Sequence, residues 1–342
     1  MISMMNMKHS FIKALLPLVA ATLATACSKN AGSNPNEDAQ RYFDAWRAIH
    51  YPDAVERNGI YFIDDQPGNG LEWRESLPVT FLQYTMRNLD GTVAYNSDEQ
   101  WAKQLGTWDQ TYYYGPQVIM TGKGASYAGL DMLLTGMKQG GTRTAIIPSW
   151  MMTYDRYDTV AEYLDHETET SASIYTIKFL DQTENLVEYQ YTTLLGYSTR
   201  MWEVSDTLST GAVFFKSFTK FAGEPVEMPT DTTVYINYTG RRLDGQVFDT
   251  TIADTAKVHH IYNPSKTYAP VSISWAEKPA DLKMDGSSSL IDGFKIGLHA
   301  MHAGEKASFA FDYRLGYSNS GSGNLIPPYA SLRFDIELVP AP

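Results

Sequence analysis

The residue types that most often carry enzymatic chemistry do not form a familiar set in this chain. Cys27 is the only cysteine among 342 residues, and no serine, cysteine and histidine combination suggests acyl transfer. His299 and His302 could share a helix face, but a zinc site needs three or four ligands. Residues 122–126 are glycine-rich, yet they lack the Lys-Ser/Thr pair of a phosphate-binding loop. We expect neither a metal nor a cofactor.

Aromatic residues around one carboxylate indicate a different kind of site. Taken singly, Tyr238, Phe248 and Phe334 alternate on strands and are most simply explained as core residues. Taken together with Asp249, and with Tyr317 in a glycine-containing turn, they predict a functional pocket. Such a pocket offers shape and hydrogen-bond donors, but no nucleophile.

Short strands and one helix are expected to position these side chains. Residues 234–238 and 332–338 alternate between apolar and polar side chains, the period of a strand with one buried face. Asp244-Gly245 is a strong turn signal between two such strands. Residues 291–300 lack proline and predict a short helix laid on the sheet. The pattern predicts an α+β fold with an antiparallel sheet.

An internal duplication sets the expected domain organisation. The chain reads YTMRNLDGTV from position 84 and YTGRRLDGQV from position 238, 154 residues later. Gly129-Leu130 is answered by Gly293-Phe294 at an offset of 164. We therefore predict two homologous domains with a linker between them and a helix before each. The expected bounds are 59–180 and 211–342 for the domains, 181–210 for the linker, and 38–50 and 186–204 for the helices.

The second copy, from about Val234 to Val339, resembles the FKBP-type prolyl isomerases. Five ordered blocks carry the resemblance: Tyr238-Thr239-Gly240 with Leu243 to Thr250, Leu290 to Phe294, Met301 with Gly304 to Lys306, Leu315 to Tyr317, and Leu325 to Leu332. In that family a half-wrapped antiparallel sheet holds a short α-helix, and an aromatic pocket between them receives the proline of a peptide. The resemblance implies two FKBP-like domains of this α+β type.

The resemblance also implies roles for individual residues. The pocket would be lined by Tyr238, Phe248, Asp249, Leu290, Ile291, Phe294, Tyr317 and Phe334. Phe294 would form the floor, where the family most often has tryptophan. Tyr317 would donate its hydroxyl to a substrate carbonyl, and the Ile291 N–H would bind a second carbonyl. Asp249 would orient Tyr238 or nearby backbone groups instead of acting as a general base.

Two departures from the family pattern are visible. Some 40 residues separate Asp249 from Ser289, which predicts an insertion over about 252–287. One aromatic wall of the family's pocket is unmatched, and the insertion offers four candidates for it: Tyr262, Tyr268, Ile273 and Trp275.

The first copy departs further from the pattern. Phe248 and Asp249 align with Ala94 and Tyr95, Gly240 aligns with Met86, and Phe294 aligns with Leu130. We therefore expect a degenerate domain that serves as a binding or spacing module.

The N-terminus resembles a lipoprotein signal. Lys8 and Lys13 supply positive charge, and residues 11–21 are mainly apolar. Ala24-Thr25-Ala26 precedes Cys27, although the preceding leucine lies one position further upstream than usual. We expect a signal peptide over 1–27, lipidation of Cys27, and a tether and helix over 28–58. An ordinary signal peptide with an incidental cysteine is the alternative. The expected location is the bacterial cell envelope, with the lipid anchor in a membrane and the chain facing the periplasm or the exterior.

Composition limits the partners. A formal net charge of -12 and a pI near 5.0 argue against nucleic acid, which binds clustered lysine and arginine. We expect proline-containing polypeptides as clients, and isomerisation of their prolyl bonds after export as the leading function. A non-enzymatic chaperone or peptide-binding lipoprotein, and a structural envelope component, are the rival hypotheses.

Overall fold

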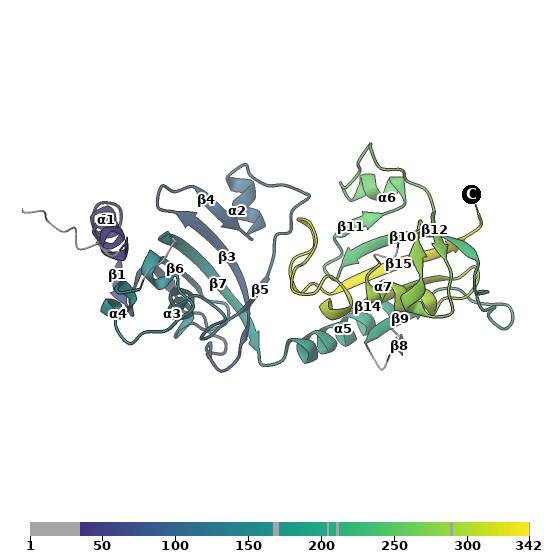
Figure 1. The fold of residues 1–342 in the computed structure, drawn as a ribbon, viewed down its shortest axis with the longest axis horizontal. Helices are drawn as coiled ribbons and strands as arrows, with labels where there is room; N and C mark the ends of the chain where they lie inside the picture. The colour runs from purple at the N-terminus through teal and green to yellow at the C-terminus, as the bar shows by residue number, and fades with distance from the viewer. Residues whose placement is uncertain (1–34, 167–170, 204, 210–211, 288–289, 342) are drawn as a thin grey trace, which may run out of the picture.

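A computed structural model describes residues 35–166, 171–203, 205–209, 212–287 and 290–341. It contains two antiparallel sheets that lie side by side and are connected through helix α5 (Leu186–Trp202) (Figure 1). The predicted α+β fold with antiparallel sheets and short helices is confirmed. The predicted signal peptide and Cys27 lie outside the described residues.

The first sheet has the strand order β1-β2-β6-β7-β3-β4, and β5 pairs with the first half of β3. Its elements are α1 (Pro35–His50), β1 (Val55–Arg57), β2 (Ile60–Gln66), β3 (Val79–Asn88), β4 (Val93–Asn96), α2 (Glu99–Gln104), β5 (Gln117–Met120), α3 (Ala128–Leu134), β6 (Thr142–Ile147), η1 (Ser149–Met151), α4 (Val160–Leu164) and β7 (Ser173–Thr183).

The second sheet has the order β13-β12-β10-β15-β14-β9-β8, and β11 also pairs with β10. Its elements are β8 (Asp206–Leu208), β9 (Val213–Ser217), β10 (Thr233–Arg242), β11 (Val247–Thr250), α6 (Ala253–Val258), β12 (Val271–Ser274), η2 (Pro279–Asp281), β13 (Lys283–Met284), α7 (Asp292–His299), β14 (Lys306–Phe311), η3 (Tyr313–Leu315) and β15 (Leu332–Val339).

The two sheets repeat one topology. The run β1-β2-β6-β7-β3 of the first corresponds to β8-β9-β14-β15-β10 of the second. In both, the strand that ends this run pairs with a short strand at each of its ends, β5 and β4 in the first sheet and β12 and β11 in the second. A helix precedes each sheet, α1 and α5, near the ranges expected from sequence. The duplication is therefore visible in the strand order itself, while the predicted domain bounds stay a prediction.

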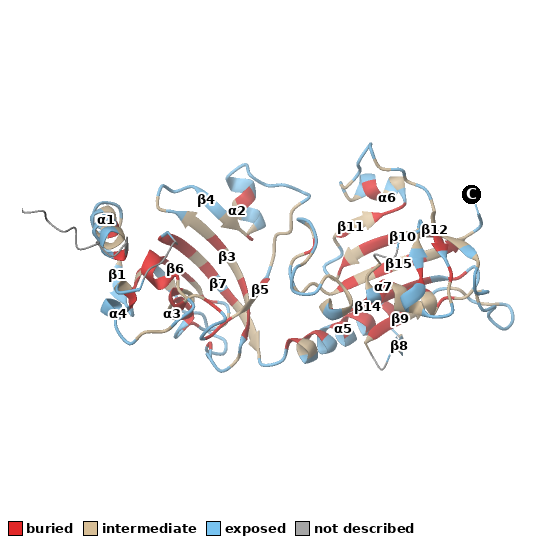
Figure 2. Cartoon of the chain, viewed as in Figure 1, coloured by how far each residue is buried: buried red, intermediate tan, exposed pale blue. Residues whose placement is uncertain are grey.

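Alternation buries one face of each sheet. Along β15, every second side chain from Leu332 to Leu338 is buried, and the residues between are half-exposed. Figure 2 shows buried residues along the strands of both sheets and on α3 and α7. Because the buried face of a sheet must be covered by apolar groups, α3 packs on the first sheet and α7 packs on the second.

Glycines let that helix approach the sheet in both halves. A Cβ on Gly293 of α7 would lie 2.5 Å from the ring of Phe311, and a Cβ on Gly129 of α3 would lie 2.2 Å from Ile147. Both distances are shorter than side-chain contacts allow, so the two helices need glycine there. In the described parts of the chain, no helix is both long and apolar enough to cross a bilayer.

Candidate functional site

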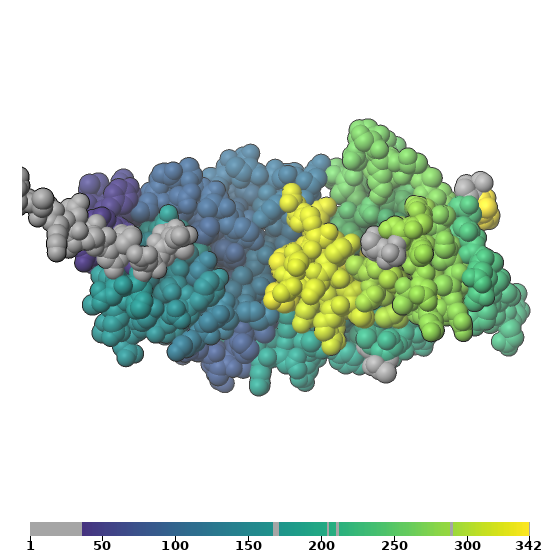
Figure 3. Space-filling view, viewed as in Figure 1, coloured from purple at the N-terminus to yellow at the C-terminus, as the bar shows by residue number. Residues whose placement is uncertain are grey.

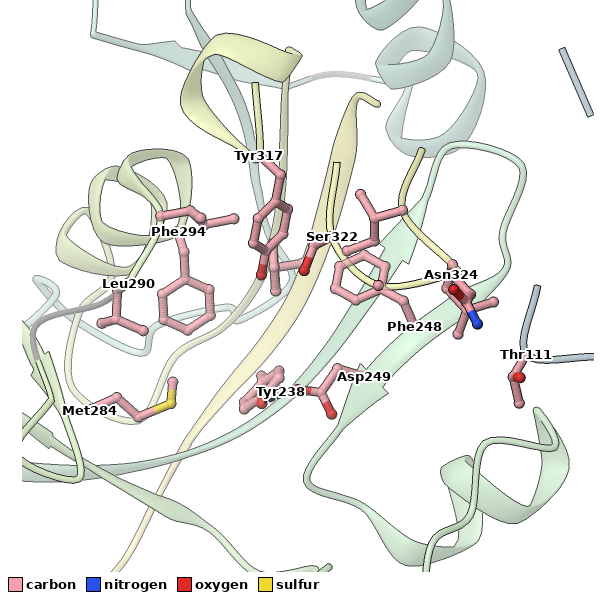
Figure 4. Close-up of a pocket in the computed structure, with 15 residues that line it drawn as sticks. Thr111, Tyr238, Phe248, Asp249, Met284, Leu290, Phe294, Tyr317, Ser322 and Asn324 are labelled. Carbon is pink, nitrogen blue, oxygen red and sulfur yellow. Dashed lines mark hydrogen bonds between the residues drawn. The ribbon is translucent and has the colours of Figure 1, made fainter. Parts of the chain in front are cut away.

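A hollow of about 460 Å³ opens between α7, the start of β11 and the loop before β15. All eight residues that the sequence predicted for a pocket line it: Tyr238, Phe248, Asp249, Leu290, Ile291, Phe294, Tyr317 and Phe334. Figure 4 shows the rings of Phe294 and Tyr317 reaching into the hollow, with Asp249 beside Tyr238. The structure therefore brings the eight residues together around one hollow, and their roles in substrate binding and catalysis stay predictions.

Tyr238 and Asp249 form the polar centre of the hollow. They lie on the neighbouring strands β10 and β11, and the Tyr238 hydroxyl donates to Oδ2 of Asp249 at 2.6 Å. Oδ1 of Asp249 accepts from the Thr250 N–H at 2.9 Å and also pairs with the Lys266 ammonium. Both oxygens of the carboxylate thus accept hydrogen bonds from the protein, which fits an orienting role better than that of a general base.

Aromatic rings form the floor and one wall. Phe294 is 2% exposed and meets Tyr238 and Phe334 edge-to-face, with ring centroids 5.9 and 5.0 Å apart. Phe248 packs on Phe334 in the same manner, at 5.7 Å. Edge-to-face contact is one of the two arrangements that aromatic pairs prefer, so the rings stabilise each other. The hollow beside them stays open.

Gly240 makes room for this wall. In the sheet it lies opposite Asp249 on one side and Phe334 on the other, next to a bulge between Gly240 and Arg241. A Cβ there would lie 2.5 Å from the Phe248 ring, so only glycine lets that ring rest on the strand. Bulges of this kind turn side chains toward a site.

Burial keeps the two tyrosines of the pocket protonated. Desolvation raises the pKa of Tyr317, and the nearby negative charge of Asp249 raises it further. The same two causes, in the same order, raise the pKa of Tyr238, whose hydroxyl also donates to Asp249. Both hydroxyls therefore remain donors well above neutral pH.

The expected insertion differs from the prediction. Its strand β12 pairs with β10 as β5 pairs with β3, so part of the segment is an ordinary strand of the sheet. None of its four candidates for the missing wall is among the lining residues of the described pocket. Ile273 and Trp275 are buried in the core, and Tyr262 stacks on Tyr268. The segment contributes Met284 to the wall instead, and Lys266 to the carboxylate.

Further lining residues escaped the sequence reasoning. Residues 322–326 come from the loop before β15, and only the last two of them belong to the Leu325–Leu332 motif. Met284 lies between polar residues and carries no local signal. Thr111 comes from the first domain, and only a knowledge of how the domains pack could have found it.

The first domain replaces the same polar centre with tyrosines. Met86 lies opposite Tyr95 in the strand pairing, as Gly240 lies opposite Asp249, so Tyr95 takes the carboxylate's place. The rings of Tyr84 and Tyr95 stack, with centroids 4.6 Å apart. The predicted alignment of the two copies agrees with this register. A smaller hollow of about 170 Å³ remains beside Tyr84, without a carboxylate in its lining.

His299 ends α7, and His302 lies beyond the helix, so the two histidines do not share a helix face as expected. The Nε2 atom of His299 lies 3.2 Å from the Ala276 carbonyl, and the Nδ1 atom of His302 lies 3.2 Å from the Glu305 carboxylate. In the described parts of the chain, no group of three histidine, cysteine or carboxylate side chains is placed to hold a metal ion.

Comparison with known sequences finds matches in the second half of the chain. Residues 224–339 match the family model for the FKBP-type peptidyl-prolyl cis-trans isomerases. A probable FKBP-type isomerase of Haemophilus influenzae is 27% identical over 118 residues, which are 34% of this chain and 39% of that protein. The FKBP-type 22 kDa isomerase of Escherichia coli is 28% identical over 106 residues, which are 31% of this chain and 39% of that protein. The matches thus span about two fifths of these relatives.

Solved structures with weaker likeness include FkpA from Escherichia coli, with 22% identity and a TM-score of 0.31 over 45% of this chain and 58% of that chain. The three FKBP domains of wheat FKBP73 show 16% identity and a TM-score of 0.29 over 83% of this chain and 94% of that chain.

Proposed function

We propose that the FKBP-type domain at residues 224–339 makes this chain a peptidyl-prolyl cis/trans isomerase that assists the folding of exported polypeptides. One observation carries the proposal: the Tyr238 hydroxyl donates to Asp249 at the side of an open hollow that Phe294 floors. Proline-containing polypeptides are the proposed substrates.

The geometry suits a reaction that needs no covalent step. Rotation about a prolyl bond faces a barrier of about 18–20 kcal/mol, because the amide must lose its partial double bond. A dry aromatic hollow that fits the twisted amide better than the planar one lowers this barrier. Phe294, Phe334 and Phe248 supply the apolar surface. Protonated Tyr317 supplies a donor for a carbonyl of the bound peptide, and the Ile291 N–H at the start of α7 is the proposed second donor.

An isomerisation assay on the full chain tests the proposal. We expect measurable catalysis with a four-residue proline peptide. Tyr317→Phe should lower kcat/KM about three- to tenfold, since one hydrogen bond contributes about 0.5–1.5 kcal/mol. Asp249→Ala should lower kcat more than it weakens peptide binding. Peptide binding without turnover in the unaltered chain would favour the chaperone hypothesis, and the absence of both would favour a scaffold.

The place of action is part of the proposal. The small residues before Cys27 support lipidation and an anchor in the bacterial cell envelope, with the domains outside the cytoplasm. Metabolic labelling with a radioactive fatty acid should mark the unaltered protein and leave Cys27→Ser unlabelled. Equal labelling of both proteins would contradict the anchor.

A further inference from the structure

The loop of residues 318–329 forms one wall of the pocket and is held from outside its own domain. It supplies residues 322–326 to the lining. The backbone N–H of Tyr113 in the first domain donates to the Asn324 carbonyl at 2.8 Å. Gln190 of α5 donates from Nε2 to the Tyr329 carbonyl at 2.7 Å. The loop is therefore tied to the first domain near its middle and to the linker helix at its end.

Arg242 strengthens the first of these ties. This buried side chain at the end of β10 donates from Nη1 to the Leu325 carbonyl at 2.7 Å. The Tyr113 ring lies over its guanidinium group, with the ring centroid 4.2 Å from Cζ. Gln246, which accepts from Arg242 at 2.7 Å, donates in turn to the Gln110 carbonyl at 3.4 Å. A desolvated guanidinium on an aromatic face is a favourable contact, so it fixes the first domain against the pocket loop.

Thr111 carries this contact to the pocket itself. It belongs to the segment of residues 107–116 between α2 and β5, and it lines the hollow from the side of Asn324 (Figure 4). Its hydroxyl donates to Asp109 within the segment at 2.7 Å, which fixes the side chain. Figure 3 shows the yellow pocket loop lying against the blue first domain along the junction of the two halves.

We infer that the 107–116 segment of the first domain is a positioning element for the pocket of the second. Tyr113 holds the 318–329 loop in the shape that receives a prolyl segment, and Thr111 forms part of the rim. The inference rests on the proposed isomerase function. A wall that is already held loses less conformational freedom when peptide binds, so the contact should act mainly on substrate binding. The degenerate domain thus acts as a fixed support for its neighbour's site.

A bulky rim residue tests whether the first domain lines the working pocket. We expect Thr111→Trp in the full chain to lower kcat/KM for a four-residue proline peptide about fivefold or more, because the indole would obstruct bound peptide. Val93→Trp adds the same group to an exposed site on β4 and should leave kcat/KM unchanged. Equal activity of Thr111→Trp and the unaltered chain would overturn the inference.

A second set of variants tests positioning by Tyr113. Tyr113→Ala should raise KM about three- to tenfold with little change in kcat, since it removes a contact that shapes the binding wall. Tyr113→Phe keeps the ring and loses only the hydrogen bond from the Tyr113 hydroxyl to the Pro116 carbonyl, so KM should stay close to that of the unaltered chain. Tyr42→Ala, which removes an exposed ring on α1, outside the 107–116 segment, is the matched control. A fall in kcat alone, or an equal effect of Tyr42→Ala, would contradict positioning.

Hydrogen exchange keeps this inference separate from the proposed function. Tyr113→Ala should speed amide exchange across residues 322–329 and leave exchange in β14 unchanged. This result does not depend on turnover, so it stands even where the unaltered chain fails as an isomerase. Unchanged exchange in residues 322–329 would overturn the inference whatever the activity.

Discussion

At the scale of single residues, the negative charge of Asp249 can be removed by a substitution that keeps the size of its side chain. Asp249→Asn keeps an acceptor for the Tyr238 hydroxyl and removes the negative charge beside the hollow. If that field favours the twisted amide, the change should lower kcat about three- to tenfold, the effect of roughly 1 kcal/mol. Peptide affinity should change less than twofold. Progress curves at several peptide concentrations give both quantities.

Lys266 supplies the control for Asp249. It pairs with the same carboxylate, and its side chain is 35% exposed. Ion pairs at this exposure contribute about 0–1 kcal/mol, so Lys266→Met should leave kcat within twofold of the unaltered chain. A loss as large as that of Asp249→Asn would mean that the carboxylate acts through the ion pair, and its proposed orienting role would be wrong.

Sequence could predict the pocket residues of the second domain that lie in alternating strands or in ordered motifs. Tyr238, Asp249 and Phe294 were found in this way, and their mutual packing agrees with the predicted site. Met284 and Thr111 could not be predicted, because they reach the pocket only through the tertiary fold. The residues next to them in sequence form no motif or alternation that would place them there.

At the scale of elements, the β10–β11 pair shapes the aromatic wall, and Gly240 is its sensitive point. In Gly240→Ala the new Cβ would lie 2.5 Å from the Phe248 ring and 3.0 Å from the Phe334 ring, so one ring must move. We expect the free energy of unfolding to fall by about 1–3 kcal/mol and KM to rise. Urea titration and peptide kinetics measure the two effects.

Gly223→Ala is the control for that change, because nothing lies within 4 Å of a Cβ at Gly223. It should leave both the free energy of unfolding and KM close to those of the unaltered chain. If Gly240→Ala behaves like this control, the ring of Phe248 moves freely, and it does not form a fixed wall.

The first domain has the same strand topology as the second but lacks two residues of the proposed isomerase site. Tyr95 stands in the place of Asp249, and Leu130 stands in the place of Phe294. A fragment of residues 35–203, shown by cooperative thermal unfolding to be folded, should therefore give no isomerase turnover above background. Turnover comparable to that of the full chain would show that the carboxylate and the aromatic floor are dispensable.

Local sequence patterns predict the long strand and the helix of the second domain better than they predict the segments between them. The alternation over β15 and the short helix α7 match their predicted ranges within a few residues. The sequence predicts one insertion over residues 252–287, yet strand β12 within this segment pairs with β10 as part of the sheet. A four-residue strand offers too little alternation to be recognised, so its role depends on the long strand beside it.

At the scale of the whole molecule, segment 107–116 of the first domain meets the second domain in a contact that neither copy predicts by itself. The contact consists of the hydrogen bond from the Tyr113 N–H to the Asn324 carbonyl, the Arg242 guanidinium on the Tyr113 ring, and the hydrogen bond from Gln246 to the Gln110 carbonyl. Such groups carry no hydrophobic pattern, so the sequence predicts only a binding or spacing role for the first domain, and that role stays a prediction. The more specific positioning role inferred above is argued from Thr111, which lines the neighbouring pocket.

Tyrosines of the first domain and of the linker helix α5 make the stability of the protein depend on pH in the alkaline range. Burial raises the pKa of Tyr84 to about 12, and burial raises that of Tyr113 to about 12 although Arg242 opposes it. Burial, with Asp181 nearby, raises the pKa of Tyr189 in the linker helix to about 12. In the unfolded chain these groups lose their protons near pH 10.

A raised folded-state pKa contributes stability that is fully present below the unfolded value and is lost as pH rises toward the folded value. The free energy of unfolding should therefore be level from pH 8 to 9 and fall between about pH 10 and 12, with a slope of up to roughly 1.4 kcal/mol per pH unit for each such tyrosine. Urea titrations across this range measure the fall, and absorbance of the tyrosinate ion counts the protons lost. Because Tyr113 is one of these titrating groups, Tyr113→Phe should reduce the slope. A folded protein whose tyrosines all titrate near pH 10 would contradict the buried environments on which this expectation depends.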